Sequence, residues 1–209
     1  MSREFHVLGN GPSQHLWFET DMKTGDAQNV VCCNMPWRTI PKARLWASII
    51  GDFKMIRPIS EGSIQADHMP WVLGNRPKMF CDQNPSFYMK YAYNIREFYL
   101  YVPPYARNAT DWSAGHLATH YSCRRLQPDV LHMWGFDSLF SSDLSSSSDF
   151  MIPSDRGDRN RFRMNNLWRG IWRGLFDEMV NVQFVVHTLK KVDISFKVPD
   201  NVSVHFKEK

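Results

Sequence analysis

The chain has 209 residues, 43% of them hydrophobic, which is enough to bury one sizeable core and favours a single domain over two. The formal charge of +4 is mildly basic, so it suits a phosphate-bearing ligand but does not by itself indicate nucleic-acid binding. The apolar runs are short and no basic segment precedes one, so the sequence predicts neither a signal peptide nor a membrane span.

Seven short apolar segments, each bounded by turn residues, lack strict alternation and indicate strands that are buried on both faces. They cover residues 5–8, 30–33, 45–50, 69–73, 96–102, 130–135 and 180–186. Helix-like stretches separate several of these segments. Strands that alternate with helices predict an α/β sheet.

The clearest helix is predicted over residues 165–179, where apolar side chains recur at helical spacing. They form one stripe made of Trp168, Ile171, Trp172, Leu175, Phe176 and Met179. A second helix is predicted over 112–125, and Pro128 limits its extent. Residues 192–207 alternate apolar and polar side chains, which predicts an edge strand or a hairpin.

The four cysteines are one adjacent pair, Cys32 and Cys33, and two single residues, Cys81 and Cys123. This pattern contains no C-x-x-C motif and favours reduced, mostly buried thiols over a disulfide framework. We therefore expect a cytoplasmic protein or, if the chain is viral, a protein of the host cytoplasm or the virion.

Residues 141–149, SSDLSSSSD, cannot bury enough apolar area to offset the entropy of ordering them. The sequence therefore predicts a mobile loop. Two interpretations remain open, a tolerated surface insertion and a lid that closes over a site.

The first predicted strand stops at Gly9-Asn10-Gly11, and Pro12 and Ser13 then open a helix. Such a turn aims backbone N–H groups and the positive end of a helix dipole at one point, where an anion such as phosphate can bind. A plain strand-to-helix turn is the alternative. The motif lacks the third glycine of G-x-G-x-x-G and the lysine of a P-loop, so neither a dehydrogenase nor a kinase-type NTPase is predicted.

Two segments, VLGNGPS at 7–13 and VVCCN at 30–34, resemble the start of the bacterial sialyltransferases of the Campylobacter type. Residues 112–137, WSAGHLATHYSCRRLQPDVLHMWGFD, are similar to the Ser-Gly helix and the strand ending in Gly-hydrophobic-Asp of that family, which a flexible lid follows. The GNGPS opening also occurs in related Rossmann-like proteins, including pterin pyrophosphokinase-like ones. The resemblance implies a Rossmann-like, mostly parallel sheet that holds a cytidine nucleotide-sugar at the carboxyl ends of its strands.

The same resemblance implies which residues hold this donor. Asn10 and Asn34 would lie against phosphate and sugar, Ser113 would meet the donor at a helix N-terminus, and Asp137 would close the nucleotide side. The implied nucleotide-binding set is Gly9, Asn10, Gly11, Ser13, Asn34, Ser113, Gly115 and Asp137.

The chain departs from the family after the lid, where it has neither the histidine that resembles a general base nor the tyrosine that follows Gly-x-Asp-x. Arginines follow the loop instead, and a guanidinium group such as that of Arg159 can bind a leaving phosphate. The base would then be Asp155, Asp158 or His116, because an acceptor hydroxyl must lose its proton. The alternative for the arginines is a solvated, salt-bridged face.

Other sites are not favoured. His116 and His120 stand four residues apart but lack the glutamate of H-E-x-x-H, and no D-x-D triplet occurs, so no metal site is predicted. The arginine-rich segment 155–173 interleaves with Trp168 and Trp172, but both belong to the apolar stripe, which argues against nucleic-acid binding. No G-x-S-x-G motif of a serine hydrolase is present.

The sequence thus predicts one α/β, Rossmann-like domain over 1–191, with 192–209 as a C-terminal strand or tail. The leading hypothesis is a glycosyltransferase-like enzyme that uses a CMP-sugar-like donor without metal and without a resident cofactor. The alternative is a non-catalytic structural or interaction protein, for example of a phage particle, that keeps the fold, has lost the base and binds a protein partner.

Overall fold

The computed structural model describes residues 2–20, 27–36, 38–66, 68–109, 111, 113–140, 158–189, 194, 196–197 and 199–207. Within these residues all strands belong to one sheet of eight parallel strands in the order β5-β4-β3-β2-β1-β6-β7-β8. The strands are β1 Glu4–Leu8, β2 Val30–Cys33, β3 Leu45–Ile50, β4 Trp71–Leu73, β5 Ile95–Phe98, β6 Val130–Trp134, β7 Gln183–Thr188 and β8 Val202–Phe206. The predicted α/β, Rossmann-like single-sheet architecture is confirmed.

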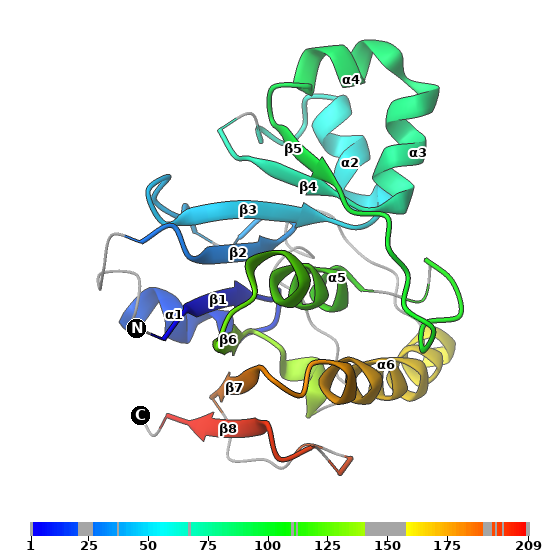
Figure 1. Ribbon diagram of the computed structural model, residues 1–209. Helices are drawn as coiled ribbons and strands as arrows, with labels where there is room; N and C mark the ends of the chain where they lie inside the picture. The colour runs from blue at the N-terminus through cyan, green and yellow to red at the C-terminus, as the bar shows by residue number, and fades with distance from the viewer. Residues whose placement is uncertain are drawn as a thin grey trace.

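Helices cover both faces of this sheet (Figure 1). In the described part of the chain they are α1 Gln14–Thr20, α2 Phe53–Ser60, α3 Asn75–Gln83, α4 Pro85–Tyr91, α5 Ala114–Tyr121 and α6 Asp158–Glu178. Helices α5 and α6 pack on the strand residues of one face, and α1 to α4 pack on those of the other. Consecutive strand residues such as Val7 and Leu8 belong to the two different core clusters, as expected when both faces of a parallel sheet are buried.

The apolar stripe of α6 faces the core as predicted. Ile171, Trp172, Leu175 and Phe176 are almost fully buried, and Trp168 packs against the same cluster. The helix begins at Asp158, seven residues before the predicted start, because the prediction followed the apolar spacing, whose first member is Trp168.

The helix predicted over 112–125 is α5 followed by one turn of π-helix, Ser122–Leu126. The α-helix begins at Ala114, since Ser113 is its N-cap. The π-helix ends at Gln127, which has a φ of 49° in the left-handed region. Trp112 lies outside the described residues.

The C-terminal segment supplies β8, an edge strand, in agreement with one of the two predicted alternatives. It pairs in parallel with β7, from Phe184 with Val202 to Thr188 with Phe206, so the hairpin alternative is wrong. A parallel pair needs a crossover connection rather than a tight turn. The predicted loop 141–149 lies outside the described residues.

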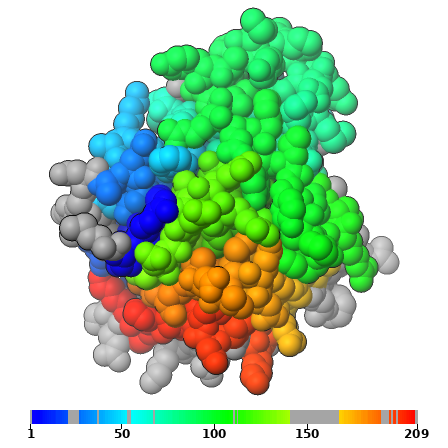
Figure 2. Space-filling model, viewed as in Figure 1, coloured from blue at the N-terminus to red at the C-terminus, as the bar shows by residue number. Residues whose placement is uncertain are grey.

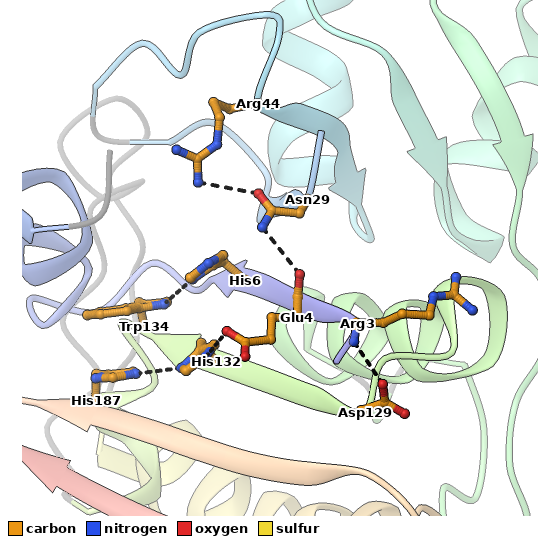
Figure 3. Close-up of polar contacts among 9 residues, drawn as sticks. All are labelled: Arg3, Glu4, His6, Asn29, Arg44, Asp129, His132, Trp134 and His187. Atoms are coloured by element: carbon orange, nitrogen blue, oxygen red, sulfur yellow. Dashed lines mark hydrogen bonds and ion pairs between the residues drawn. The ribbon is translucent and has the colours of Figure 1, made fainter. Parts of the chain in front are cut away.

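Histidines line up on one face of the sheet across four adjacent strands, and those of β1, β6 and β7 are drawn in Figure 3. We call His6, His132, His187 and His205 the histidine row. In the strand register His6 lies opposite His132, and His187 lies opposite His205. His132 Nδ1 lies 3.0 Å from His187 Nε2. Trp134 links the row, because its indole N–H donates to His6 Nδ1 at 3.1 Å and its ring stacks on His187.

All four cysteines are free and buried, which confirms the prediction of reduced, buried thiols. Burial raises the pKa of the Cys32 thiol to about 12, so it stays protonated and inert. Among the described helices, none is both long and apolar enough to cross a bilayer.

Candidate functional site at the carboxyl edge

The strand order changes direction between β1 and β6, and open α/β sheets bind their ligands outside the carboxyl ends of the strands at such a point. Two turns, 9–13 after β1 and 135–137 after β6, meet there. The N–H of Gly9 donates to the carbonyl of Trp134 at 2.7 Å, and that of Gly11 donates to Gly135 at 2.8 Å. The structure thus brings the two predicted motifs into direct contact.

A carboxylate already caps the start of α1. Asp137 accepts hydrogen bonds from the Ser13 N–H at 2.9 Å and from the Ser13 hydroxyl at 2.6 Å. The same hydroxyl accepts from the Leu189 N–H at 3.1 Å, which ties the end of β7 to this point. The expectation that a ligand phosphate sits at the start of α1 is therefore corrected, because the side chain of Asp137 fills that place.

The glycines of the two turns are required by this packing. A Cβ atom on Gly11 would overlap the Asp137 carboxylate, and one on Gly135 would come within 2.6 Å of the Gly9 carbonyl. Gly135 also has a φ of 76°, in the region that favours glycine. The glycines therefore allow two backbone turns to approach each other, a reason different from the approach of a phosphate.

Three neighbouring strands are each followed by a buried side-chain oxygen without a hydrogen-bond partner among the described residues. These oxygens, which we call the oxygen row, are Oδ1 of Asn10 after β1, Oδ1 of Asn34 after β2 and Oδ1 of Asp52 after β3. Since β1, β2 and β3 are adjacent in the sheet, the three residues share one edge. Buried acceptors without partners are costly, so the oxygen row is suited to a ligand that supplies hydrogen-bond donors.

Asn34 stands out within the oxygen row. Its side chain is 7% exposed, and its φ of 53° is a left-handed conformation that asparagine tolerates better than most residues. Its N–H donates to Ile49 at 2.9 Å, and its carbonyl accepts from the Ser48 hydroxyl. The backbone of Asn34 is thus fixed while its side-chain oxygen remains unsatisfied, a combination found at ligand sites.

The start of α5 lies over the same edge. Ser113 and His116 form a capping box, in which the Ser113 N–H donates to His116 Nδ1 at 3.1 Å and the His116 N–H donates to the Ser113 hydroxyl at 3.3 Å. A Cβ on Gly115 would lie 3.1 Å from the ring of Phe136, so this glycine seats α5 on the turn after β6. Ser113 and Gly115 therefore position the helix start beside both turns.

His116 is corrected from a candidate base to a structural residue. Its ring is fully buried, lies 4.2 Å from that of Trp172 and meets Trp168 edge to face. Burial lowers the pKa of His116 to about 3, although a hydrogen bond with the Trp168 backbone acts in the opposite direction. A general base works best with a pKa near the operating pH and must reach the substrate, and His116 meets neither condition.

The side chains of the other predicted catalytic groups are outside what the structure describes. Asp155 is not described. Asp158 and Arg159 begin α6, so the helix N-terminus is placed but their side chains are not described.

Sequence reasoning missed a shallow surface depression beside the oxygen row. It opens at the carboxyl ends of β3, β4 and β5 and is lined by Gly51, Asn75, Tyr101, Val102, Ser113 and Leu117. It also missed Asp52, which follows Gly51 directly. The available signal was that Gly51 and Asp52 come immediately after an apolar strand, because such positions lie at the ligand-binding edge of a parallel sheet.

No family model matches this chain, and no curated protein or solved structure is significantly similar to it. The resemblance to the sialyltransferases therefore rests on the motifs alone. Within the described residues no group of three or more His, Cys, Asp or Glu side chains is arranged to hold a metal ion. His116 and His120 engage different partners, Ser113 and Tyr99 respectively.

Proposed function

We propose that the protein binds a CMP-type nucleotide-sugar at the carboxyl edge of the sheet and transfers the sugar without a metal ion. The observation that carries this proposal is the oxygen row. A nucleotide-sugar offers the donors that three buried oxygens need, namely the hydroxyls of its two sugars and the amino group of cytosine. The four buried thiols suit a reducing compartment, so we expect the protein to act in the cytoplasm.

The proposed roles follow from position. Asn10 and Asn34 accept hydrogen bonds from the donor. The first N–H groups of α5, which the macrodipole makes partly positive, face its phosphate. Arg159 is the candidate that neutralises the phosphate as it leaves, since its place at the start of α6 follows the segment predicted as a lid.

The proton acceptor is the remaining role. Asp137 is engaged by Ser13, whereas Asp52 keeps one buried oxygen without a partner among the described residues. In the proposed step, an acceptor hydroxyl attacks the anomeric carbon, the bond from that carbon to the phosphate oxygen breaks, and CMP departs. The hydroxyl proton passes to the Asp52 carboxylate.

Calorimetric titration with CMP, CDP and UDP tests the nucleotide site. We expect micromolar binding of CMP that is about tenfold weaker in Asn10→Ala and in Asn34→Gly, because each variant loses one buried hydrogen bond. Glycine is chosen at residue 34 since it keeps the left-handed backbone without strain. Asn181→Ala, an exposed asparagine just before β7 and so at the opposite edge of the sheet, is the matched control and should bind like the wild type.

Absence of binding by all three nucleotides would overturn the proposal and favour the second candidate, a non-catalytic interaction protein. One observation favours that candidate. Most of the large apolar side chains that are exposed belong to a single stretch, which contains α3 and α4 and forms the upper part of the molecule in Figure 2: Met79, Tyr88, Met89, Tyr93, Leu100 and Tyr101. Exposed apolar surface of this kind is typical of protein interfaces. Sedimentation equilibrium over a wide concentration range would detect self-association through it.

A further inference from the structure

The last strand, β8, forms one margin of the sheet (Figure 1). It pairs with β7 on one side, and no described strand pairs with it on the other. The outer backbone groups of an edge strand can accept a strand from another chain, and proteins usually prevent this with charged residues, proline or a covering segment. The two edges of this sheet differ in that respect.

The opposite edge, β5, carries charged side chains. Two of its four residues, Arg96 and Glu97, are charged. Both are held in place, because Arg96 donates to the Trp46 carbonyl at 2.9 Å and Glu97 forms an ion pair with Arg125 at 2.6 Å. Fixed charges on an edge strand discourage pairing with another chain, so β5 is a protected edge.

Strand β8 has no such protection in its own sequence. It reads VSVHF and contains no proline, aspartate, glutamate, lysine or arginine. Val204 is 37% exposed and Phe206 is 38% exposed. The start of the strand is nevertheless firmly anchored, because the Asn201 amide donates to the carbonyls of Phe176, Met179 and Val182 at distances of 3.1–3.3 Å. The result is an apolar edge that is held in the sheet.

The ladder with β7 determines which backbone groups of β8 face outward. The carbonyl of Asn201 accepts from β7 at 2.8 Å, and the N–H of Lys207 donates to β7 at 3.4 Å. Alternate residues of a parallel edge strand bond to its neighbour, so the N–H and C=O groups of Val204 and Phe206 point away from β7. The side chains of these two residues lie on the same face as Val202, which packs on the core cluster under α6.

These outward groups are complementary to a second copy of the same strand. In an antiparallel pair with a two-fold axis at Val204, this residue lies opposite its equivalent, and Val202 lies opposite Phe206 of the other copy. All three residues direct a carbonyl outward, and Val204 and Phe206 also direct an N–H outward, so ladder bonds can form in both directions. Pairs of β-branched residues with each other and with aromatic rings stabilise such ladders.

The charges at the two ends of β8 favour the same arrangement. Asp200 precedes the strand and Lys207 follows it. Antiparallel pairing brings the acidic end of one strand to the basic end of the other, whereas parallel pairing would place like charges together.

We propose that β8 is a self-association surface through which two copies of the chain pair antiparallel and continue the sheet across a two-fold axis. The partner is a second copy because the side chains, backbone groups and end charges of β8 all complement those of β8 itself. The inference is independent of the proposed nucleotide site, since β8 lies three strands away from β1. Because only one pair of short strands meets, we expect a weak dimer that dissociates on dilution.

Sedimentation velocity over a wide range of protein concentrations tests the dimer. Val204→Lys should weaken it by about tenfold or more, because two lysines would lie directly opposite each other. Val204→Thr keeps a β-branched side chain and should associate within about threefold of the wild type. Met89→Lys makes the same kind of exchange at a residue of α4 that is 73% exposed, and it should associate as the wild type does.

Cross-linking tests the register. Val204→Cys places two cysteines opposite each other at a Cα separation of about 5.5 Å, which a disulfide can span. Mild oxidation should therefore give a covalent dimer much faster than it does with Val180→Cys, the matched control, which changes a valine that is 63% exposed between α6 and β7. The four native cysteines are buried and should contribute little to the reaction.

Three results would overturn the proposal. The first is a wild type that stays monomeric at every concentration. The second is a dimer that Met89→Lys dissociates and Val204→Lys does not, because the contact would then involve α3 and α4. The third is a Val204→Cys variant that cross-links no faster than Val180→Cys. The circular dichroism of Val204→Lys should match that of the wild type, since this exposed residue directs its backbone groups away from β7.

Discussion

At the scale of single residues, the turn after β1 illustrates how one motif supports two explanations. The glycines of Gly9-Asn10-Gly11 suit a phosphate-binding turn, yet their neighbours in the structure are the backbone and carboxylate of the turn after β6. Asp137, 124 residues further along the chain than Ser13, provides the negative charge at the start of α1. This helix start is therefore neutralised within the protein, and Asn10 is the residue of the turn whose buried side-chain oxygen has no hydrogen-bond partner among the described residues.

Replacing Gly11 with alanine should destabilise the fold. The new Cβ would overlap the Asp137 carboxylate and force the two turns apart, so we expect a loss of about 1–3 kcal/mol in the free energy of unfolding. Urea denaturation measures it. Gly51→Ala is the matched control on the same edge, because its Cβ would have no neighbour closer than 3.5 Å, and it should change stability by less than about 0.5 kcal/mol. Equal stability of the two variants would show that the turns are not closely packed.

These residues also show what the sequence can and cannot predict about the site. That Gly9 to Ser13 form a turn was predictable from local chemistry, because glycine, asparagine and proline restrict the backbone in known ways. The contact between Asp137 and Ser13 was not predictable, since it depends on β1 and β6 being neighbours in the sheet. His116 was misassigned for a related reason: only packing against Trp172 shows that its ring is buried.

At the scale of elements, the strands were predicted more accurately than the helices. Strands β2 and β3 have the predicted bounds, because each is a buried apolar run between turn residues. Helices α2, α3 and α4 were not located, since each has only seven to nine residues, too few for a helical spacing of apolar positions to repeat clearly. The segment 99–102 was predicted to continue β5, but it leaves the sheet after Phe98 and carries Tyr99 and Tyr101 to α5.

Two glycines in α6 should respond in opposite directions to alanine. A Cβ on Gly170 would meet nothing within 4 Å, so Gly170→Ala should stabilise the protein by about 0.5–1 kcal/mol through helix propensity. A Cβ on Gly174 would come within 2.5 Å of the Tyr105 ring, so Gly174→Ala should destabilise it by about 1–3 kcal/mol. Thermal unfolding of both variants compares them within one helix. If both raise the melting temperature, α6 is not packed against the Tyr105 loop.

At the scale of the whole molecule, the histidine row spans four adjacent strands and contains two rings, His6 and His187, whose pKa is strongly lowered. Burial, and then the charges of His132 and Arg44, lower the pKa of His6 to about 3, and burial and the neighbouring histidines lower that of His187 to about 3. A carboxylate faces the histidine row: Glu4 Oε2 lies 3.6 Å from His132 Nε2 (Figure 3). The folded protein therefore keeps the rings of His6 and His187 neutral at a pH where the same histidines of the unfolded chain bind protons.

This difference predicts acid sensitivity. Both pKa values lie below the value of 6.5 for a free histidine, so stability is complete above pH 6.5 and falls as the pH drops toward 3. For His6 alone the loss between pH 7 and pH 5 should be on the order of 2 kcal/mol. Urea denaturation at several pH values measures it. His6→Asn should reduce the dependence of the unfolding free energy on pH by about one proton.

An unchanged pH dependence in His6→Asn would show that the row is solvated and titrates normally in the folded protein. The comparison concerns how steeply the free energy of unfolding changes with pH. A loss of stability that is the same at every pH, caused by removing the hydrogen bond from Trp134, therefore does not affect the conclusion.

The position of β1 in the middle of the sheet has a consequence for biosynthesis. Glu4 pairs with Val130, which follows it by 126 positions in the chain, so the second neighbour of the first strand is translated much later than the strand itself. At the usual speed of ribosomes this takes roughly ten seconds, and during that time one backbone edge of an apolar strand remains open to other nascent chains. The half-sheet β1 to β5 is thus the species that chaperones would have to protect, and co-translational misassembly should be greatest just before β6 emerges.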